Sequence, residues 1–154
     1  MLTDVERQQV QELFGLYSTK WAAAVEAMQV VQASRGWVPD EALFDLAGLM
    51  EVSPDYLESL ATFYSMIFRR PVGRHVIMVC DSVCCWMAGS EKVVSYLSGR
   101  LGIGLGETSA DGRFTLLPVV CLGACEQAPA MMVDWQLFGD LTQAKVDAIL
   151  GEHK

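Results

Sequence analysis

Apolar side chains recur at helical spacing through the first 70 residues. Thr3 and Glu6 fit a capping box, in which each side chain accepts a hydrogen bond from the other residue's backbone N–H. From this start we expect one long helix that ends near Arg35, with Gly36 in the left-handed position that follows many helices. One face of this helix would carry Trp21, Val25, Met28 and Gln32.

Two more helices are predicted before residue 71. The first follows Pro39-Asp40, where apolar residues again recur every three or four positions. The second begins at Ser53-Pro54, because serine is a good N-cap and proline suits the first helical position. We expect it to end at Arg69-Arg70, whose charges favour a helix C-terminus. The three helices indicate a helical bundle.

From Arg74 the pattern changes to that of a sheet. Strands are expected at 75–80, 114–120 and 130–135, with a short fourth at 137–138, and helices at 91–100 and 142–150. This order is typical of a small layered α/β domain. The chain is therefore predicted to be α+β, with a helical bundle at 1–72 and an α/β domain at 73–154.

Composition and charge exclude several classes of protein. Hydrophobic residues make up 52% of the 154 and charged residues 19%, which excludes a disordered chain. The net charge of −8 would repel a phosphate backbone, so we expect no nucleic-acid partner. No apolar stretch is long enough for a membrane helix, and no signal or transit peptide is visible, so we expect a cytoplasmic protein without direct membrane insertion.

The five cysteines fall into two groups, each directly after a predicted strand. Cys80, Cys84 and Cys85 form the first group, and Cys121 and Cys125 form the second. If the two strands are neighbours, both groups lie at one edge of the sheet. Converging thiolates repel one another unless a metal centre neutralises them. The pattern predicts a metal or iron–sulfur site.

Other interpretations of these cysteines remain open. Buried cysteine is a common small hydrophobe, but that does not explain clustering at strand ends. A thioredoxin-type dithiol needs Cys-x-x-Cys, which the chain lacks. Structural zinc sites usually have shorter cysteine knuckles than the first loop. An iron–sulfur cluster suits the loop around Gly123, where backbone amides can approach the sulfurs.

The cysteine spacing resembles that of a known family. Four residues separate Cys80 from Cys85, 35 separate Cys85 from Cys121, and three separate Cys121 from Cys125. This resembles the thioredoxin-like 2Fe–2S ferredoxin subunit of bacterial respiratory complex I, an NADH:quinone oxidoreductase. Further similar segments are Arg35 to Pro39, Ala61 to Ser65, Pro71 to Gly73, Asp111 to Leu116 and Pro129 to Asp134.

The resemblance implies a ligand set and a fold. The ligands of one 2Fe–2S cluster would be Cys80, Cys85, Cys121 and Cys125, in a thioredoxin-like domain with a small mixed sheet. Spacing alone would allow Cys84 as readily as Cys85, and the resemblance selects Cys85. Cys84, which departs from the family pattern, is then expected to be a packing residue.

The resemblance also implies a function as a one-electron carrier. NADH and flavin mononucleotide (FMN) would bind only on a partner flavoprotein subunit, since this chain has no nucleotide fingerprint. Other iron–sulfur subunits of the peripheral arm would be further partners, and the complex would hold the chain at the inner face of the cell membrane. The helical bundle would dock on the partner, which argues against a free shuttle. Equivalent subunits occur in NAD-dependent formate dehydrogenases and NAD-linked hydrogenases, and a zinc-stabilised interaction module is the alternative without electron transfer.

Five residues near the cysteine motifs carry smaller expectations. Trp86 is expected either to shield the cluster from water or to lie in the core. Pro129 is expected to follow a cis peptide bond, as in thioredoxin-like folds. His75 is predicted to be structural, and Asp134 and Glu126 are expected at a solvated edge.

Overall fold

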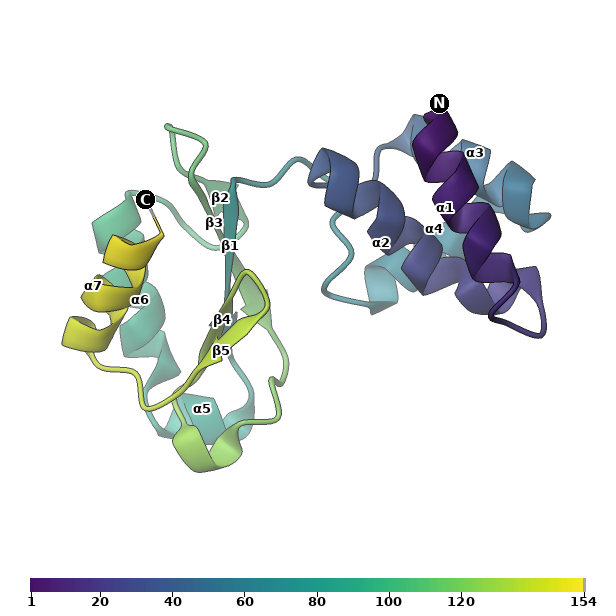
Figure 1. Cartoon of the computed structure of the whole chain (residues 1–154). Helices are drawn as coiled ribbons and strands as arrows, with labels where there is room; N and C mark the ends of the chain where they lie inside the picture. The colour runs from purple at the N-terminus through teal and green to yellow at the C-terminus, as the bar shows by residue number, and fades with distance from the viewer. Residues whose placement is uncertain (154) are drawn as a thin grey trace. The chain divides into compact units, whose positions relative to one another are not determined.

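The computed structural model describes residues 1–153, which divide into two compact units (Figure 1). The helical unit spans Met1–Pro71, and the sheet unit begins at Val72. Each unit has its own hydrophobic core. The sequence places the boundary one residue further along, after residue 72.

Four α-helices and a short 3-10 turn build the helical unit. They are α1 (Asp4–Phe14), η1 (Lys20–Ala23), α2 (Ala24–Arg35), α3 (Asp40–Met50) and α4 (Pro54–Phe63). The capping box at Thr3 and Glu6 is confirmed. Gly36 ends α2 with φ of 81°, and the Ser53 hydroxyl accepts a hydrogen bond from the Tyr56 N–H at the start of α4. Local signals therefore set most helix ends.

The single long helix predicted up to Arg35 is wrong. The chain leaves α1 at Gly15, whose N–H bonds back to the carbonyls of Glu12 and Leu13, and re-enters helix only at Ala24. Trp21 lies in the intervening turn with 56% of its surface exposed, so it does not share the buried face of Met28.

The helix from Ser53 also ends earlier than predicted, at Phe63 instead of Arg70. The buried Gln32 side chain donates to the Met66 carbonyl (2.9 Å) and accepts from the Phe68 N–H (2.6 Å). These two bonds satisfy backbone groups that would otherwise pair within a longer helix. A side chain distant in sequence therefore replaces the last turns of helix.

A five-stranded mixed sheet organises the second unit. Its elements are β1 (His75–Cys80), α5 (Val83–Met87), α6 (Ser90–Leu101), β2 (Glu107–Thr108), β3 (Phe114–Val119), η2 (Cys125–Gln127), β4 (Met131–Val133), β5 (Gln136–Phe138) and α7 (Gln143–Glu152). The strand order is β2-β3-β1-β4-β5, with β1 and β3 parallel and the other pairs antiparallel. The predicted α+β class is confirmed. The sequence missed β2 and α5, which span only two and five residues.

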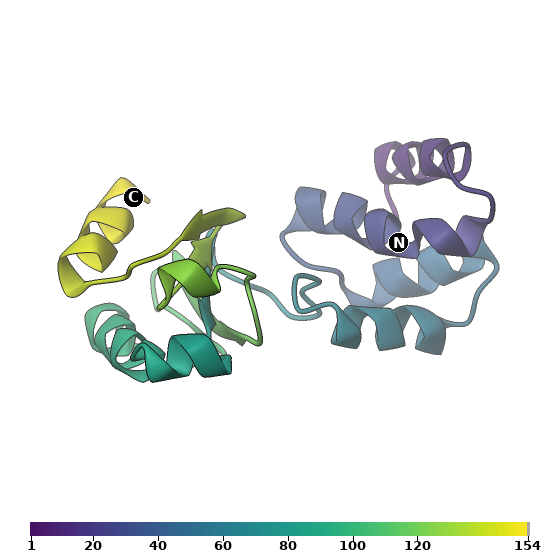
Figure 2. The same cartoon turned by 90° about the horizontal axis from the view of Figure 1, so that it is seen from below.

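Helices α6 and α7 lie on the same side of the sheet in both views (Figures 1 and 2). Val93 and Leu97 of α6 and Val146 of α7 share a buried cluster with Ile77 and Leu116 of the central strands. This core holds β1 and β3 rigidly, and the ends of those strands carry the cysteines.

The longest helices, α2 and α6, have 12 residues each. Among the 153 described residues, no helix is both long and apolar enough to span a lipid bilayer.

Candidate metal centre

The register of β1 and β3 brings the two cysteine groups to one edge of the sheet. The strands run parallel, and Cys80 at the end of β1 pairs with Val119 at the end of β3. Cys121 follows two residues later, and the Cys80 Sγ lies 3.7 Å from the Val120 carbonyl oxygen. The predicted adjacency of these strands is confirmed.

The first group presents two buried thiols and one exposed thiol. Cys80 is 3% exposed at the strand end, and Cys85 is 2% exposed in α5. Cys84 is exposed, because successive residues of a helix point about 100° apart. The expectation that Cys84 is a packing residue is therefore wrong: its neighbour in α5 occupies the buried direction.

The second group lies in an exposed loop around a glycine. Cys121 and Cys125 are both exposed. Gly123 has φ of 73°, and its N–H donates to the Cys121 Sγ at 3.4 Å. An added Cβ at this position would meet no atom within 4 Å, so the backbone conformation and not lack of space favours glycine. The predicted approach of a backbone amide to a cysteine sulfur is confirmed.

The proximity of the thiols changes their acidity. Burial raises the pKa of Cys85, and the neighbouring Cys80 side chain adds to the effect. Contact with the Cys84 side chain is the largest cause that raises the pKa of Cys125 to about 11, and Cys121 contributes as well. These thiols stay protonated near neutral pH unless a cation replaces their protons.

The thiols gather in small sets and not around one point. Cys80 neighbours Cys85, while Cys125 neighbours Cys84 and Cys121. Within residues 1–153, no three His, Cys, Asp or Glu side chains converge so as to hold a single metal ion. A 2Fe–2S cluster instead takes two thiolates on each of its two irons. The donor set fits such a cluster in its chemistry.

Ala130 is a contact to the site that sequence reasoning missed. Its carbonyl accepts the Cys80 N–H at 3.1 Å, and its backbone also hydrogen-bonds to Cys85, which opposes the rise in the pKa of that thiol. Both contacts use main-chain atoms, so the alanine side chain gives no signal in the sequence. Only its position directly after Pro129 could have pointed to it.

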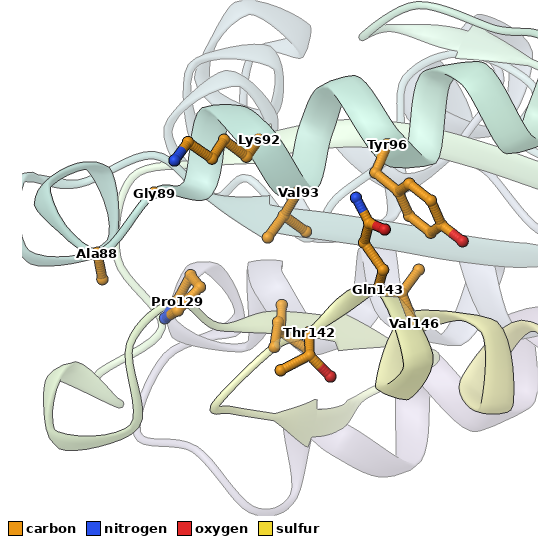
Figure 3. Close-up of a pocket in the computed structure, with 10 residues that line it drawn as sticks. Ala88, Gly89, Lys92, Val93, Tyr96, Pro129, Thr142, Gln143 and Val146 are labelled. Atoms are coloured by element: carbon orange, nitrogen blue, oxygen red, sulfur yellow. The ribbon is translucent and has the colours of Figure 1, made fainter.

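The Ala128–Pro129 peptide bond is cis, as predicted. Pro129 also lines a pocket of about 220 Å³ between α6 and α7, which Figure 3 shows. The lining residues are Ala88, Gly89, Lys92, Val93, Tyr96, Pro129, Leu141, Thr142, Gln143 and Val146. None of the five cysteines faces this pocket, so it lies outside the candidate metal centre.

The remaining candidates separate into structural and exposed residues. Trp86 is 56% exposed, which excludes the core interpretation and leaves the shielding role as a prediction. His75 has a structural contact, as predicted, with its Nδ1 at 2.5 Å from Asp134 Oδ2. Asp134 is more than a solvated edge residue, since it also accepts the Val76 N–H at 3.0 Å. Glu126 is exposed, as expected.

Comparisons with known proteins agree with this architecture. The chain is 47% identical over 150 residues to a subunit of the NADH-quinone oxidoreductase of Pseudomonas aeruginosa, covering 97% of this chain and 90% of that protein. It is 42% identical over 153 residues to the protein of the same name from Escherichia coli K12, covering 99% and 92%.

A crystal structure of an NAD+-reducing [NiFe]-hydrogenase in the air-oxidized state is also similar. The TM-score is 0.71 at 25% identity, and the match covers 84% of this chain but only 22% of the hydrogenase chain. The family model described as thioredoxin-like [2Fe-2S] ferredoxin matches residues 10–154. The chain thus belongs to the thioredoxin-like [2Fe-2S] ferredoxin family.

Proposed function

We propose that the chain is the 2Fe–2S electron-carrier subunit of an NADH:quinone oxidoreductase. The cluster ligands in this proposal are Cys80, Cys85, Cys121 and Cys125. One observation carries it: the parallel register of β1 and β3 places both cysteine groups at the same edge of the sheet. The names of the relatives, which match nearly the full chain, support the same assignment.

The proposed cluster would accept and return one electron at a time. The protein supplies the surroundings that tune this exchange. Cys80 and Cys85 bind from a buried position, whereas Cys121 and Cys125 bind from the surface. The Gly123 N–H donates to a ligand sulfur, and such hydrogen bonds stabilise added negative charge. The asymmetry leaves the second loop as the side open to an electron partner.

The electron partner in this proposal is a separate flavoprotein subunit that binds NADH and FMN. NADH delivers two electrons as a hydride, so a flavin must stand between it and a one-electron carrier. Further contacts would be made to other iron–sulfur subunits of the peripheral arm. The assembled complex would hold the chain at the cytoplasmic face of the membrane.

The helical unit is the docking element in this proposal. Three of its aromatic side chains are more than half exposed: Trp21 at 56%, Phe44 at 59% and Phe63 at 78%. Exposed aromatic residues are typical anchors of protein interfaces. Full-length protein with Phe44→Ser and Phe63→Ser should lose affinity for the flavoprotein subunit while keeping its cluster. Unchanged affinity would remove this role.

Metal analysis tests the central proposal. Protein purified without oxygen is expected to contain about two irons and two acid-labile sulfides per chain. About one zinc per chain without sulfide would overturn electron transfer and favour a zinc-stabilised interaction module. Colour separates the two outcomes at once, because a zinc thiolate site is colourless and a 2Fe–2S centre is red-brown.

A second candidate is the equivalent subunit of an NAD+-reducing hydrogenase. The structural match to such an enzyme, at a TM-score of 0.71, favours it over other NAD-linked complexes such as formate dehydrogenases. Isolation of the native complex through this chain distinguishes the two. NADH-dependent quinone reduction supports the first proposal, and hydrogen-dependent NAD+ reduction supports the second.

A further inference from the structure

Gly139 lies against the turn that begins with Cys125. A Cβ added at Gly139 would overlap the Cβ of Gln127 and come within 2.8 Å of the Gln127 carbonyl oxygen. Real Cβ atoms essentially never come so close to a backbone atom. Gly139 does not have a positive φ, so the requirement is for space and not for backbone freedom.

Hydrogen bonds hold the two segments in this close contact. The Asp140 N–H donates to the Gln127 carbonyl at 2.6 Å, and the Leu141 N–H donates to the Pro129 carbonyl at 3.2 Å. From the first turn of α7, the Lys145 Nζ donates to the Gly139 carbonyl at 2.6 Å. Figure 3 shows Pro129 beside Thr142, the residue that follows this segment. Helix α7 is thereby linked to the Cys125 turn.

The turn under Gly139 reaches both cysteine groups. It begins at Cys125, whose carbonyl accepts the Ala128 N–H at 3.3 Å. It ends at Ala130, whose carbonyl accepts the Cys80 N–H at 3.1 Å and whose backbone also bonds to Cys85. A displacement of Gln127 therefore moves a ligand of one pair and a contact of the other.

We propose that residues 139–141 form a clamp that sets the distance between the two cysteine pairs, with Gly139 as its positioning residue. This inference rests on the proposed function, because it concerns the geometry of the proposed ligands. The clamp touches no sulfur itself. It acts through the backbone of residues 125–130.

The test uses full-length protein with Gly139→Ala, reconstituted without oxygen. The larger side chain should push the Cys125 turn outward, so iron should pass to a chelator about tenfold faster than from wild type. The electron paramagnetic resonance spectrum and the midpoint potential of the reduced cluster should also change. Gly151→Ala is the matched control, because a Cβ there meets no atom within 4 Å, and it should behave as wild type.

A second substitution tests the direction of the effect. Gln127→Gly removes the Cβ and the side-chain oxygen that a Cβ at Gly139 would meet. Added to Gly139→Ala, it should restore part of the wild-type spectrum and slow iron loss. A general loss of stability would not be rescued by a further glycine.

Three results separate the possibilities. A wild-type spectrum and wild-type iron loss for Gly139→Ala would overturn the clamp. Absence of iron and sulfide from wild type would instead overturn the proposed function. If Gly139→Ala does not fold by circular dichroism, Lys145→Met decides, since it removes only the bond to the Gly139 carbonyl. Faster iron loss from that variant supports the clamp, and unchanged loss overturns it.

Discussion

The two units treat their buried acidic groups in opposite ways. In the helical unit, Glu6 is 2% exposed and fully partnered. Its carboxylate accepts from Arg35 Nε at 2.8 Å, from Arg35 Nη2 at 2.6 Å, from the Thr3 N–H at 2.8 Å and from the Ser34 hydroxyl. These contacts, Arg35 above all, hold the pKa of Glu6 well below its usual value.

In the sheet unit the acidic groups lack such a cation. Burial raises the pKa of Cys85, and contact with Cys84 raises the pKa of Cys125 to about 11. A carboxylate with a complete set of partners stabilises the fold at neutral pH. Thiols that crowd together without a cation store a demand for one instead. The comparison teaches that the first unit is built for stability and that the second gains its charge balance only from a metal.

Removal of a buried thiol should have the largest effect. Cys85→Ala is expected to abolish the cluster, since Cys85 is a proposed ligand that lies beside Cys80. Cys84→Ala should keep about two irons and two sulfides per chain. Absorbance in the visible range and iron content measure both variants. The reverse result, with the cluster lost only from Cys84→Ala, would show that the exposed thiol is the ligand.

Loss of the Glu6 carboxylate should destabilise the helical unit alone. Glu6→Ala leaves Arg35, whose side chain is 20% exposed, without its main partner, at a cost of about 3–5 kcal/mol. Hydrogen exchange of residues 1–71 measures this loss, while the cluster spectrum should stay unchanged. Glu12→Ala on the same helix is the control, because Glu12 is exposed and its loss should cost less than about 0.5 kcal/mol. Equal effects would contradict the assigned role of the buried pair.

The same pair should make the helical unit sensitive to acid. Because the pKa of Glu6 is lowered in the folded chain, its contribution is complete above the unfolded value of 4.5 and is lost as the pH falls below it. Below that value the loss is about 1.4 kcal/mol per pH unit until Glu6 protonates in the folded state. Denaturation at several pH values should therefore show a steeper decline for wild type than for Glu6→Gln. Parallel declines would show that other carboxylates control the acid response.

The helical unit also shows which structure the sequence can predict. Gly36, Ser53 and the Thr3 capping box act through neighbouring backbone atoms, so their patterns were sufficient. The early end of α4 depends on Gln32, more than 30 residues away, and no local pattern contains that contact. Propensity predicts helix at residues 64–70, and a tertiary hydrogen bond overrides it.

The metal centre divides in the same manner. The cysteine spacing and the two strands predicted that both groups meet, because the ends of parallel strands lie at one edge. The direction of Cys84 could not be predicted, since it depends on the register of a five-residue helix. Ala130 and Gly139 were missed because they act through backbone contact and through the absence of a side chain.

The smallest expected effect comes from one helix cap in each unit. The Ser53 hydroxyl accepts the Tyr56 N–H at 3.2 Å in the helical unit, and the Thr142 hydroxyl accepts the Lys145 N–H at 3.2 Å in the sheet unit. Replacement of either by alanine should cost about 1 kcal/mol. Hydrogen exchange should assign the loss from Ser53→Ala to residues 1–71 and the loss from Thr142→Ala to the residues that follow. If Thr142→Ala weakened both units equally, they would unfold as one cooperative body, and stability and metal binding could not be divided between them.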